Sequence, residues 1–352
     1  MKVLHVINSM CIGGAEMLLA NSLSTGALPE VCENVLVYLQ GDSEILSKID
    51  KRVKVICLEY KGVTTLNVLI RKLRSVIKNN NIDIIHSHLN PAGFYTRIAA
   101  PAKYKQVHTL HIMYTRDTET GVLKKKLEDL FLLKSRNTSL IFLSELLRKD
   151  FLSHIKFKNK TFVLNNFISD DFFKPYHRTI SEDKFKIIAV GNIRVQKNYK
   201  YLVEVFKYLK EYDIALDIYG SGDNKWLQSI IDGEGLNIKL MGQTTDTSTV
   251  LGEYDLFIMA STFEGYPLSV IEAMATGLPC LLSNIPALKD IGKDYAEYFE
   301  LNDPYAAAQK IIAISENREV IFEKGRLAKE YAANIGKKEN YVKNLIRIYQ
   351  SL

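Results

Sequence analysis

Two glutamates, Glu264 and Glu272, stand with seven residues between them in a segment that has the composition of a ligand-binding loop. The apolar run 256–260 before them is typical of a buried strand. Gly265 and Pro267 fit poorly inside a regular element, and from this proline on, apolar residues recur at helical spacing. We therefore place Glu264 in the loop after a strand and Glu272 about two turns into the next helix. A carboxylate there, beside the free N–H groups of a helix start, suits a ligand with hydroxyl groups and an anionic group.

Positive charge is expected at a second strand end. The apolar segment 185–191 leads into a loop that carries Arg194 and Lys197, and a helix begins near Tyr199. Cations held at such a turn can bind an anionic group of a ligand. The alternative is a pair of solvated loop cations.

Histidines end two further strands. Residues 83–88 form a buried strand that ends in His86 and His88, and alternate residues of a strand point to the same face. Residues 106–111 form the next strand and end in His111. Two histidines on one face suit a metal ion, but the sequence near them offers no carboxylate or third histidine at ligand spacing. We therefore predict no metal site.

A glycine pair follows the first strand. Residues 3–8 are strand-like, Gly13 and Gly14 come next, and a helix is expected from about Met17. Glycines at this place let a ligand approach the backbone closely. The G-x-G-x-x-G spacing of a dinucleotide-binding loop is missing. Glu16 is expected to brace the loop.

The elements that must position these side chains alternate between strand and helix. Further strands are predicted at residues 35–39, 53–58, 215–219 and 238–242, and amphipathic helices at residues 66–79 and 338–351. Such alternation favours parallel sheets, whose carboxyl edge binds ligands. A chain of 352 residues favours two domains.

Composition excludes several classes of protein. With 47% apolar and 24% charged residues the chain is not disordered, and no apolar run approaches the about 20 residues that span a bilayer. The start is too short for a signal peptide, so we expect a cytoplasmic protein. The net charge of +6 permits contact with anionic membranes or phosphorylated substrates but does not indicate nucleic-acid binding. The cysteines lack metal-ligand spacing and are expected to be buried free thiols: Cys11, Cys32, Cys57 and Cys280.

The residues around the two glutamates carry a family resemblance. The run resembles the donor-binding signature of the retaining glycosyltransferases of family 4, which have the GT-B fold. Its matching residues are Glu264, Gly265, Pro267, Glu272, Ala273, Met274, Ala275, Gly277 and Pro279. The resemblance implies an α/β protein with two Rossmann-like, doubly wound domains that face each other across a cleft. It also implies that Glu264 faces the donor sugar and that Glu272 binds the nucleotide ribose.

The resemblance extends to the other strand ends. Lys197 matches a family lysine that neutralises the donor diphosphate; Asn192 stands where the family has arginine, and Arg194 is expected to replace it. His111, in a Thr-x-His element, is expected beside the donor sugar. Together with Glu264, Lys197 and Arg194 it makes up the predicted catalytic set. The predicted donor-binding set is Gly13, Gly14, Gly191, Asn192, Gly220, Gly222, Gln243, Gly265, Tyr266, Pro267, Leu268 and Glu272.

The acceptor side is expected in the first domain, with contacts from His88 and Asn166. Near Asn166 the chain departs from the family, because Phe167 replaces the usual glycine and Ser169 the usual aspartate. The predicted division is an acceptor-binding domain over 1–170, a linker over 171–184, a nucleotide-sugar-binding domain over 185–335 and a C-terminal helix over 336–352 that crosses back to the first domain.

The basic segment 121–136 has two interpretations. It is either an ordinary helix with solvated lysines or a surface for anionic membrane, as in family members that act on lipid-linked acceptors. The expected activity is metal-independent, retaining transfer of a sugar from a nucleotide-sugar, with UDP-sugar favoured, to a glycan or lipid-linked acceptor. By the resemblance, the setting is bacterial surface-polysaccharide synthesis, with no separate cofactor and no nucleic-acid partner. A sugar-nucleotide epimerase, a phosphorylase and a non-catalytic partner of another transferase stay open as alternatives.

Overall fold

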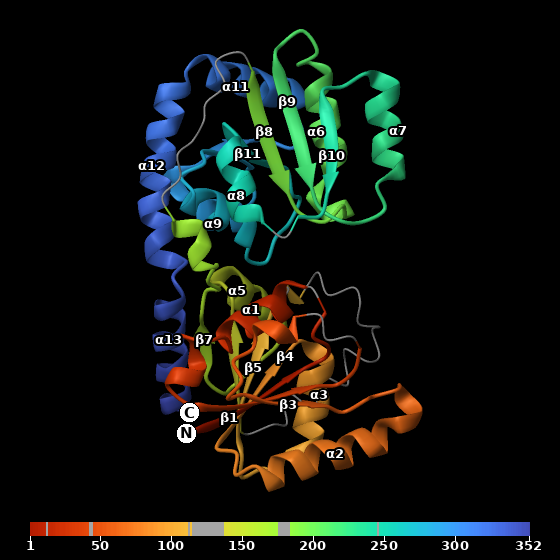
Figure 1. Ribbon diagram of the computed structural model, residues 1–352, viewed down its shortest axis with the longest axis vertical. Coiled ribbons are helices and arrows are strands. Elements are labelled where there is room, and N and C mark those ends of the chain that lie inside the picture. Colours follow the sequence, from red (N-terminus) through yellow and green to blue (C-terminus); the bar gives the residue numbers. More distant parts are fainter. Residues whose placement is uncertain (12, 42–44, 112, 115–136, 175–183, 245) are drawn as a thin grey trace. The chain divides into compact units, whose positions relative to one another are not determined.

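The computed structural model describes residues 1–352 except 12, 42–44, 112, 115–136, 175–183 and 245 (Figure 1). The chain forms two compact units: Met1–Phe167 with Lys338–Leu352, and Ile168–Lys337. The basic segment 121–136 lies outside the described residues. Among the described helices, none is long and apolar enough to cross a membrane.

The first unit is built on a seven-stranded sheet in the order β3-β2-β1-β4-β5-β6-β7. Every neighbouring pair of strands is parallel. The strands are β1 Lys2–Ile7, β2 Glu33–Tyr38, β3 Lys54–Cys57, β4 Ile84–His88, β5 Lys105–Leu110, β6 Thr138–Phe142 and β7 Thr161–Val163. The helices are α1 Gly14–Ser22, α2 Leu66–Asn79, α3 Asn90–Ala99, α5 Glu145–His154 and α13 Lys338–Ser351, with 3-10 turns at Leu28–Glu30, Leu46–Lys48 and Val63–Thr65.

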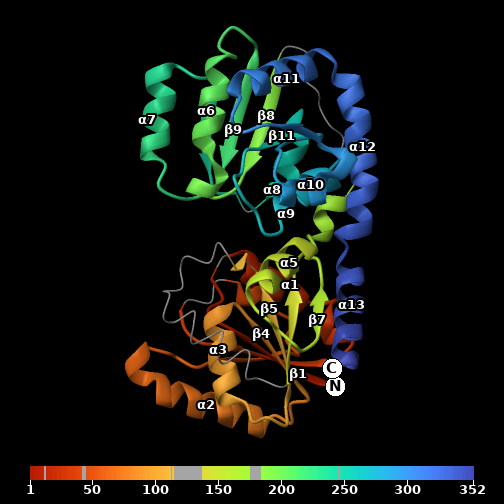
Figure 2. The same cartoon turned by 180° about the vertical axis from the view of Figure 1, so that it is seen from behind.

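The amphipathic helices of this unit bury the faces that their sequences predict. Helix α2 buries Leu69, Leu73 and Ile77, which recur at helical spacing, against the core. Helix α13 is the last element of the chain but places Leu345 and Tyr349 in the core that β1 and α1 also form. Figures 1 and 2 show α13 within this unit, near β7.

The second unit has a six-stranded parallel sheet in the order β10-β9-β8-β11-β12-β13. Its strands are β8 Phe185–Val190, β9 Ile214–Tyr219, β10 Ile238–Gly242, β11 Leu256–Met259, β12 Cys280–Ser283 and β13 Glu297–Phe299. Its α-helices are α6 Tyr199–Lys207, α7 Lys225–Glu234, α8 Thr247–Val250, α9 Leu268–Ala275, α10 Pro286–Gly292, α11 Pro304–Glu316 and α12 Arg318–Ile335. Its 3-10 turns are η5 Asp170–Phe173, η6 Val195–Lys197, η7 Leu251–Glu253 and η8 Lys293–Tyr295.

One apolar core of the second unit joins its sheet to several of its helices. Strands β8, β9 and β11 meet α6, α7 and α11 in one cluster of buried residues. Figures 1 and 2 both show α6 and α7 side by side, and α9 packs against α12. This core holds the strand ends in place, so that the loops after β8 and β11 lie on a rigid base.

The two sheets reverse their strand order at corresponding places. The reversal lies between β1 and β4 in the first unit and between β8 and β11 in the second. In open parallel sheets the crevice at the carboxyl ends of such strands is the ligand site. The prediction of two Rossmann-like α/β domains is confirmed by this topology.

The thiols are less buried than the sequence analysis predicts. The four cysteines all belong to the described residues and form no disulfide, but only Cys280 is buried. The other three, Cys11, Cys32 and Cys57, are partly exposed, because they lie in loops or at the end of the edge strand β3.

Candidate functional site

An ion pair stands at the strand-order reversal of the second sheet. Lys197 ends the turn η6 after β8, and Glu264 lies in the loop between β11 and α9. The Nζ of Lys197 lies 2.8 Å from the Oε1 of Glu264, with the two side chains 15% and 9% exposed. Ser261 donates a hydrogen bond of 2.6 Å to the same oxygen. The sequence predicts the Lys197 cation and the Glu264 carboxylate at two different strand ends, and the fold brings them into contact.

Backbone contacts hold the two loops at this distance. The amide of Thr262 donates to the carbonyl of Gln196 at 2.8 Å, which ties the loop after β11 to the turn η6. The hydroxyl of Tyr199 donates to the carbonyl of Gly191 at 2.6 Å and fixes the exit of β8. Lys197 is therefore positioned by backbone as well as by its carboxylate partner.

Two glycines are required by the close packing of the loops. A Cβ atom at Gly220 would lie 2.0 Å from the carbonyl oxygen of Gly191, a distance that no side chain tolerates. A Cβ atom at Gly191 would lie 2.9 Å from the Cε of Lys197 and would displace the lysine. The two glycines therefore let the loops after β8 and β9 pack closely and leave space for the Lys197 side chain beside Gly191.

Glu272 lies one turn into α9 rather than the two turns expected, because the helix begins only at Leu268. Its side chain is partly buried. Removal from water raises the pKa of the Glu272 carboxyl to about 7, although the positive charge of Lys197 acts in the opposite direction. The carboxylate is therefore close to its titration point at neutral pH and accepts hydrogen bonds from hydroxyl groups when it is ionised.

The cations and amide of the η6 loop differ in how they are held. Arg194 is exposed at the start of η6, whereas Lys197 is held against Glu264. Asn192 accepts a hydrogen bond of 3.0 Å from the hydroxyl of Ser221, so that its side chain braces the exit loop of β9. Lys197 is thus the preorganised cation of this turn.

Several other predicted donor-binding residues lie in the loop before α9 or at the same edge of the sheet. Tyr266 and Pro267 are buried in the loop before α9, and Gly265 and Leu268 are partly exposed. Burial raises the pKa of the Tyr266 hydroxyl. Two further predicted residues, Gly222 after β9 and Gln243 after β10, are exposed at the same edge of the sheet.

The glycine loop of the first unit follows β1. Gly13 has an extended backbone and precedes α1, which begins at Gly14 and not near Met17. Glu16 forms hydrogen bonds to Ser9 and to its own backbone, and burial raises the pKa of its carboxyl. Glu16 thus braces the loop, as its place in the first turn of the helix indicates.

His86 and His88 do share a face of β4, with ring centres 4.1 Å apart. The two nitrogens of His86 lie 2.6 Å from the hydroxyl of Tyr349 and 2.7 Å from that of Thr109. His88 is only 2% exposed. His111 is partly exposed after β5, its ring centre lies 6.0 Å from that of His88, and burial lowers the pKa of His111 to about 4.

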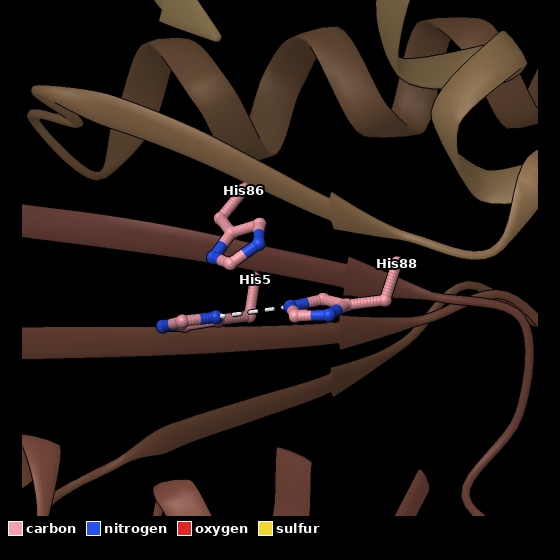
Figure 3. Close-up of side chains that lie close together, drawn as sticks. All are labelled: His5, His86 and His88. Atoms are coloured by element: carbon pink, nitrogen blue, oxygen red, sulfur yellow. Dashed lines mark hydrogen bonds between the residues drawn. The ribbon is translucent and has the colours of Figure 1, made fainter. Parts of the chain in front are cut away.

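The sequence near His86 and His88 offers no third histidine at ligand spacing, but the fold brings one to them from β1. Strand β1 pairs with β4 so that His5 is the register partner of His86 (Figure 3). The Nδ1 of His5 lies 3.5 Å from the Nε2 of His88. The sequence shows that the strand β1 contains His5, but only the order of strands in the sheet reveals that His5 lies beside β4.

Comparison with known protein families finds a match for each half of the chain. Residues 19–172 match the Glycosyltransferase Family 4 domain, and residues 172–335 match the Glycosyl transferases group 1 domain. The chain belongs to this glycosyltransferase family.

Curated relatives match most of the chain in sequence, and a solved structure shares its fold. The glycosyltransferase is 26% identical over 291 residues to the UDP-Gal:alpha-D-GlcNAc-diphosphoundecaprenol alpha-1,3-galactosyltransferase of Escherichia coli, covering 76% of this chain and 74% of the relative. It is 25% identical over 323 residues to the capsular polysaccharide biosynthesis glycosyltransferase CapH of Staphylococcus aureus, covering 85% and 86%. The structure of Alr3699/HepE of Anabaena in complex with UDP-glucose superposes with a TM-score of 0.84 at 16% identity and covers all of both chains. The predicted GT-B fold is confirmed.

The departures of this glycosyltransferase from the family pattern have local explanations. Phe167 packs on Tyr341 of α13, with ring centres 4.8 Å apart, and belongs to the core of the first unit. Ser169 accepts a hydrogen bond from the amide of Asp171 and caps the turn η5. Asn166 is buried, and its side-chain oxygen has no partner among the described residues.

Proposed function

We propose that this glycosyltransferase moves a sugar from a UDP-sugar to a hydroxyl group of a glycan or lipid-linked glycan, with retention of configuration and without a metal ion at the diphosphate. The observation that carries the proposal is the buried pair of Lys197 and Glu264 at the strand-order reversal of the second sheet, with Glu272 on the next helix. An anion-binding cation and two hydroxyl-binding carboxylates are the groups that a nucleotide-sugar needs.

Lys197 takes the diphosphate in this proposal. The lysine is already held by backbone and by Glu264, so that little reorganisation accompanies binding. When the diphosphate engages Lys197, the oxygen of Glu264 that now accepts from lysine is released to accept from a sugar hydroxyl. Arg194 adds charge from the surface, where solvent screens it.

Glu272 binds the ribose. Its carboxyl group has left water in part, and two adjacent ribose hydroxyls would donate to its ionised form. Binding therefore favours the ionised carboxylate and shifts its titration to lower pH. The amides after Gly265 and the exits at Gly191 and Gly220 line the remaining donor site, with Gly222 and Gln243 toward the base.

All bonds that form and break in the chemical step belong to the donor and the acceptor. The acceptor oxygen forms a bond to the anomeric carbon on the face from which the nucleotide leaves, while the bond between that carbon and the diphosphate oxygen breaks. The acceptor proton passes to the departing diphosphate, whose growing negative charge Lys197 stabilises. The products are the new glycoside and the protonated nucleoside diphosphate.

The relatives favour UDP and a surface-glycan setting. The Escherichia coli relative is named for a UDP-galactose donor and a diphosphoundecaprenol acceptor, the Staphylococcus aureus relative for capsular polysaccharide, and the Anabaena structure holds UDP-glucose. We extend the same donor nucleotide and acceptor class to this chain, and with them a location at the cytoplasmic face of a cell membrane. A membrane contact through the basic segment 121–136 belongs to this proposal and lies outside the described residues.

The first unit supplies the acceptor side of the proposal. Gly13 and Gly14 leave room for a substrate at the exit of β1, and His111 contributes a neutral imidazole beside the reacting sugar. His88 and Asn166 are buried and would act on the acceptor through the groups around them. These roles follow from the resemblance and are tested by substitution.

The first experiment measures the thermal stability of the purified protein with UDP, GDP, ADP and CMP in turn. A nucleotide at about 100 times its dissociation constant adds roughly 2.7 kcal/mol to the free energy of unfolding, so a shift with UDP alone is expected. A selective shift with another nucleotide would overturn the UDP assignment. Transfer is then tested with UDP-sugars and a lipid-linked acceptor; isomerisation of the donor without acceptor would indicate an epimerase, and binding without turnover a non-catalytic partner.

A further inference from the structure

Three buried histidines meet at the strand-order reversal of the first sheet (Figure 3). His5 comes from β1, and His86 and His88 come from β4; one ring nitrogen from each lies within 4.8 Å of the others. All three side chains are at most 2% exposed. Their contacts show which ring nitrogens carry lone pairs.

The tautomer of His5 is fixed by its neighbours. The side-chain amide of Asn34 donates to the carbonyl of Cys32 at 2.7 Å, so its oxygen faces the Nε2 of His5 at 3.1 Å. An amide oxygen only accepts hydrogen bonds, and the Nε2 of His5 must therefore carry the proton. The Nδ1 of His5 then carries a lone pair, and it points at the Nε2 of His88, 3.5 Å away.

His88 has an unmet hydrogen-bonding demand in either tautomer. Its Nδ1 is buried and has no partner among the described residues. A proton on Nε2 leaves the lone pair of Nδ1 unmet and makes only a long hydrogen bond to His5. A proton on Nδ1 leaves that N–H unmet and sets two lone pairs against each other, an arrangement that a cation between His5 and His88 relieves.

His86 completes the set without losing all of its support. Each of its nitrogens contacts one hydroxyl group, from Tyr349 and Thr109, and a hydroxyl either donates or accepts. One nitrogen of His86 can therefore exchange its hydroxyl partner for an ion, while the other nitrogen keeps its hydroxyl partner. Metal-ligating histidines generally hold their second nitrogen in this way, as Asn34 already does for His5.

We propose that His5, His86 and His88 bind one divalent metal ion that prefers imidazole ligands, with Zn²⁺ as its representative. The ligand atoms are the Nδ1 of His5, the Nε2 of His88 and one nitrogen of His86, and a water molecule would complete four-coordination. Three imidazoles without a carboxylate favour Zn²⁺, Cu²⁺ or Ni²⁺ over Mg²⁺ or Ca²⁺.

The location indicates a structural role for the ion. It would join β1 to β4, the strands that lead to the Gly13–Gly14 loop and to His88. This role does not involve the donor diphosphate, which Lys197 and not a metal stabilises in the proposed transfer reaction.

The test measures metal binding to the full chain after dialysis against a chelator. Titration with Zn²⁺ should give saturable binding of one ion per chain and raise the melting temperature. Co²⁺ should develop the intense visible absorption of a four- or five-coordinate ion with nitrogen ligands. The absence of saturable Zn²⁺ binding, or the weak spectrum of six-coordinate aqueous Co²⁺, would overturn the proposal.

Variants locate the ion. His88→Gln should abolish binding, and Asn34→Ala, which removes the support of His5, should weaken it about 10-fold. His154→Gln is the matched control, because His154 is an exposed histidine on α5 and should leave binding unchanged. Unchanged binding in His88→Gln, or loss of binding in His154→Gln, would overturn the assignment. Circular dichroism establishes that each variant is folded, and the Co²⁺ spectrum of the unmodified chain decides the question if His88→Gln is not. None of these readouts depends on transferase activity.

Discussion

The two sheets of this glycosyltransferase share a strand order around its reversal. The side chains at the reversal are charged in the second unit and neutral in the first. In the second unit the loops after β8 and β11 carry Lys197 and Glu264 as a buried ion pair. In the first unit the corresponding strands β1 and β4 carry His5 and His88, whose low pKa values keep them neutral. The same topology thus builds an ion pair, which we propose binds the donor, and an uncharged cluster of imidazoles. Topology fixes the place of a site, and the side chains decide its chemistry.

The energetic cost differs between the two places. Removing one partner of the Lys197–Glu264 pair would leave an unpaired charge in a poorly hydrated site, which is the cost of placing charged side chains there. The histidines avoid that cost by staying unprotonated, and they lose this advantage when the pH falls. The following predictions separate the two arrangements, beginning with the largest expected effect.

Acid should destabilise the first unit of the metal-free protein more than the second unit. The pKa values of His5 and His111 are about 4 in the folded unit and about 6.5 in the unfolded chain, so the unfolded chain binds more protons between these values. Stability falls as the pH drops from 6.5 to 4, by about 1.4 kcal/mol per pH unit for each such histidine. The only histidine in the sequence of the second unit is His177, which lies outside the described residues.

Hydrogen exchange followed by mass spectrometry at pH values from 7 to 4, corrected for the intrinsic exchange rate, measures this difference unit by unit. Peptides from β1 and β4 should lose protection before peptides from β8 and β11. Simultaneous loss in both units would break the comparison, because it would show that the histidines do not set the acid stability of their own unit.

Lys197→Ala should lower the rate of transfer about 100-fold or more, since it removes a preorganised charge from a developing anion. The matched control is Lys200→Ala, three residues further on and exposed on α6, which should transfer at nearly the normal rate. Initial rates at saturating donor and acceptor compare the two. Normal turnover in Lys197→Ala would refute the assignment of this lysine to the diphosphate.

Glu272→Gln should weaken binding of free UDP about 10-fold, the equivalent of one hydrogen bond to a charged group. In the unmodified protein the affinity for UDP should rise as the pH increases through 7, because the ribose hydroxyls bind the ionised carboxylate, whose pKa is about 7. Titration calorimetry from pH 6 to 8 measures both effects. A Gln variant that keeps the pH dependence of the unmodified protein would remove Glu272 from the ribose site.

The local sequence carried much of this architecture. The predicted bounds of the helices at residues 66–79 and 338–351 agree with the structure, because their apolar residues recur strictly at helical spacing. The strands before Lys197 and Glu264 were also found from their apolar runs. Glu272 was placed one turn too deep, since the pattern does not show where the backbone after Pro267 first becomes helical.

Long-range pairing explains what the sequence could not provide. His5 and His88 are 83 positions apart, and nothing in either strand states that β1 and β4 are neighbours. Lys197 and Glu264 were both expected in the donor site, but their direct ion pair depends on the adjacency of β8 and β11. Phe167 departs from the family pattern for a reason that only the packing of Tyr341 from the end of the chain reveals.

Arg194→Ala should have the smallest effect, a loss of donor affinity of about 2- to 5-fold. Arg194 begins the turn that Lys197 ends, but its side chain is exposed, and an exposed charge contributes at most about 1 kcal/mol to an ionic contact. The loss should shrink further as salt is raised, because solvent ions screen an exposed charge more than a buried one. Donor KM measured at low and high ionic strength for Arg194→Ala and Lys197→Ala gives the comparison. If Arg194→Ala raises the donor KM as much as Lys197→Ala does, the net positive charge of the loop matters more than a cation held in place. The contrast with the neutral histidine cluster would then apply to the charge of the whole loop and not to one preorganised lysine.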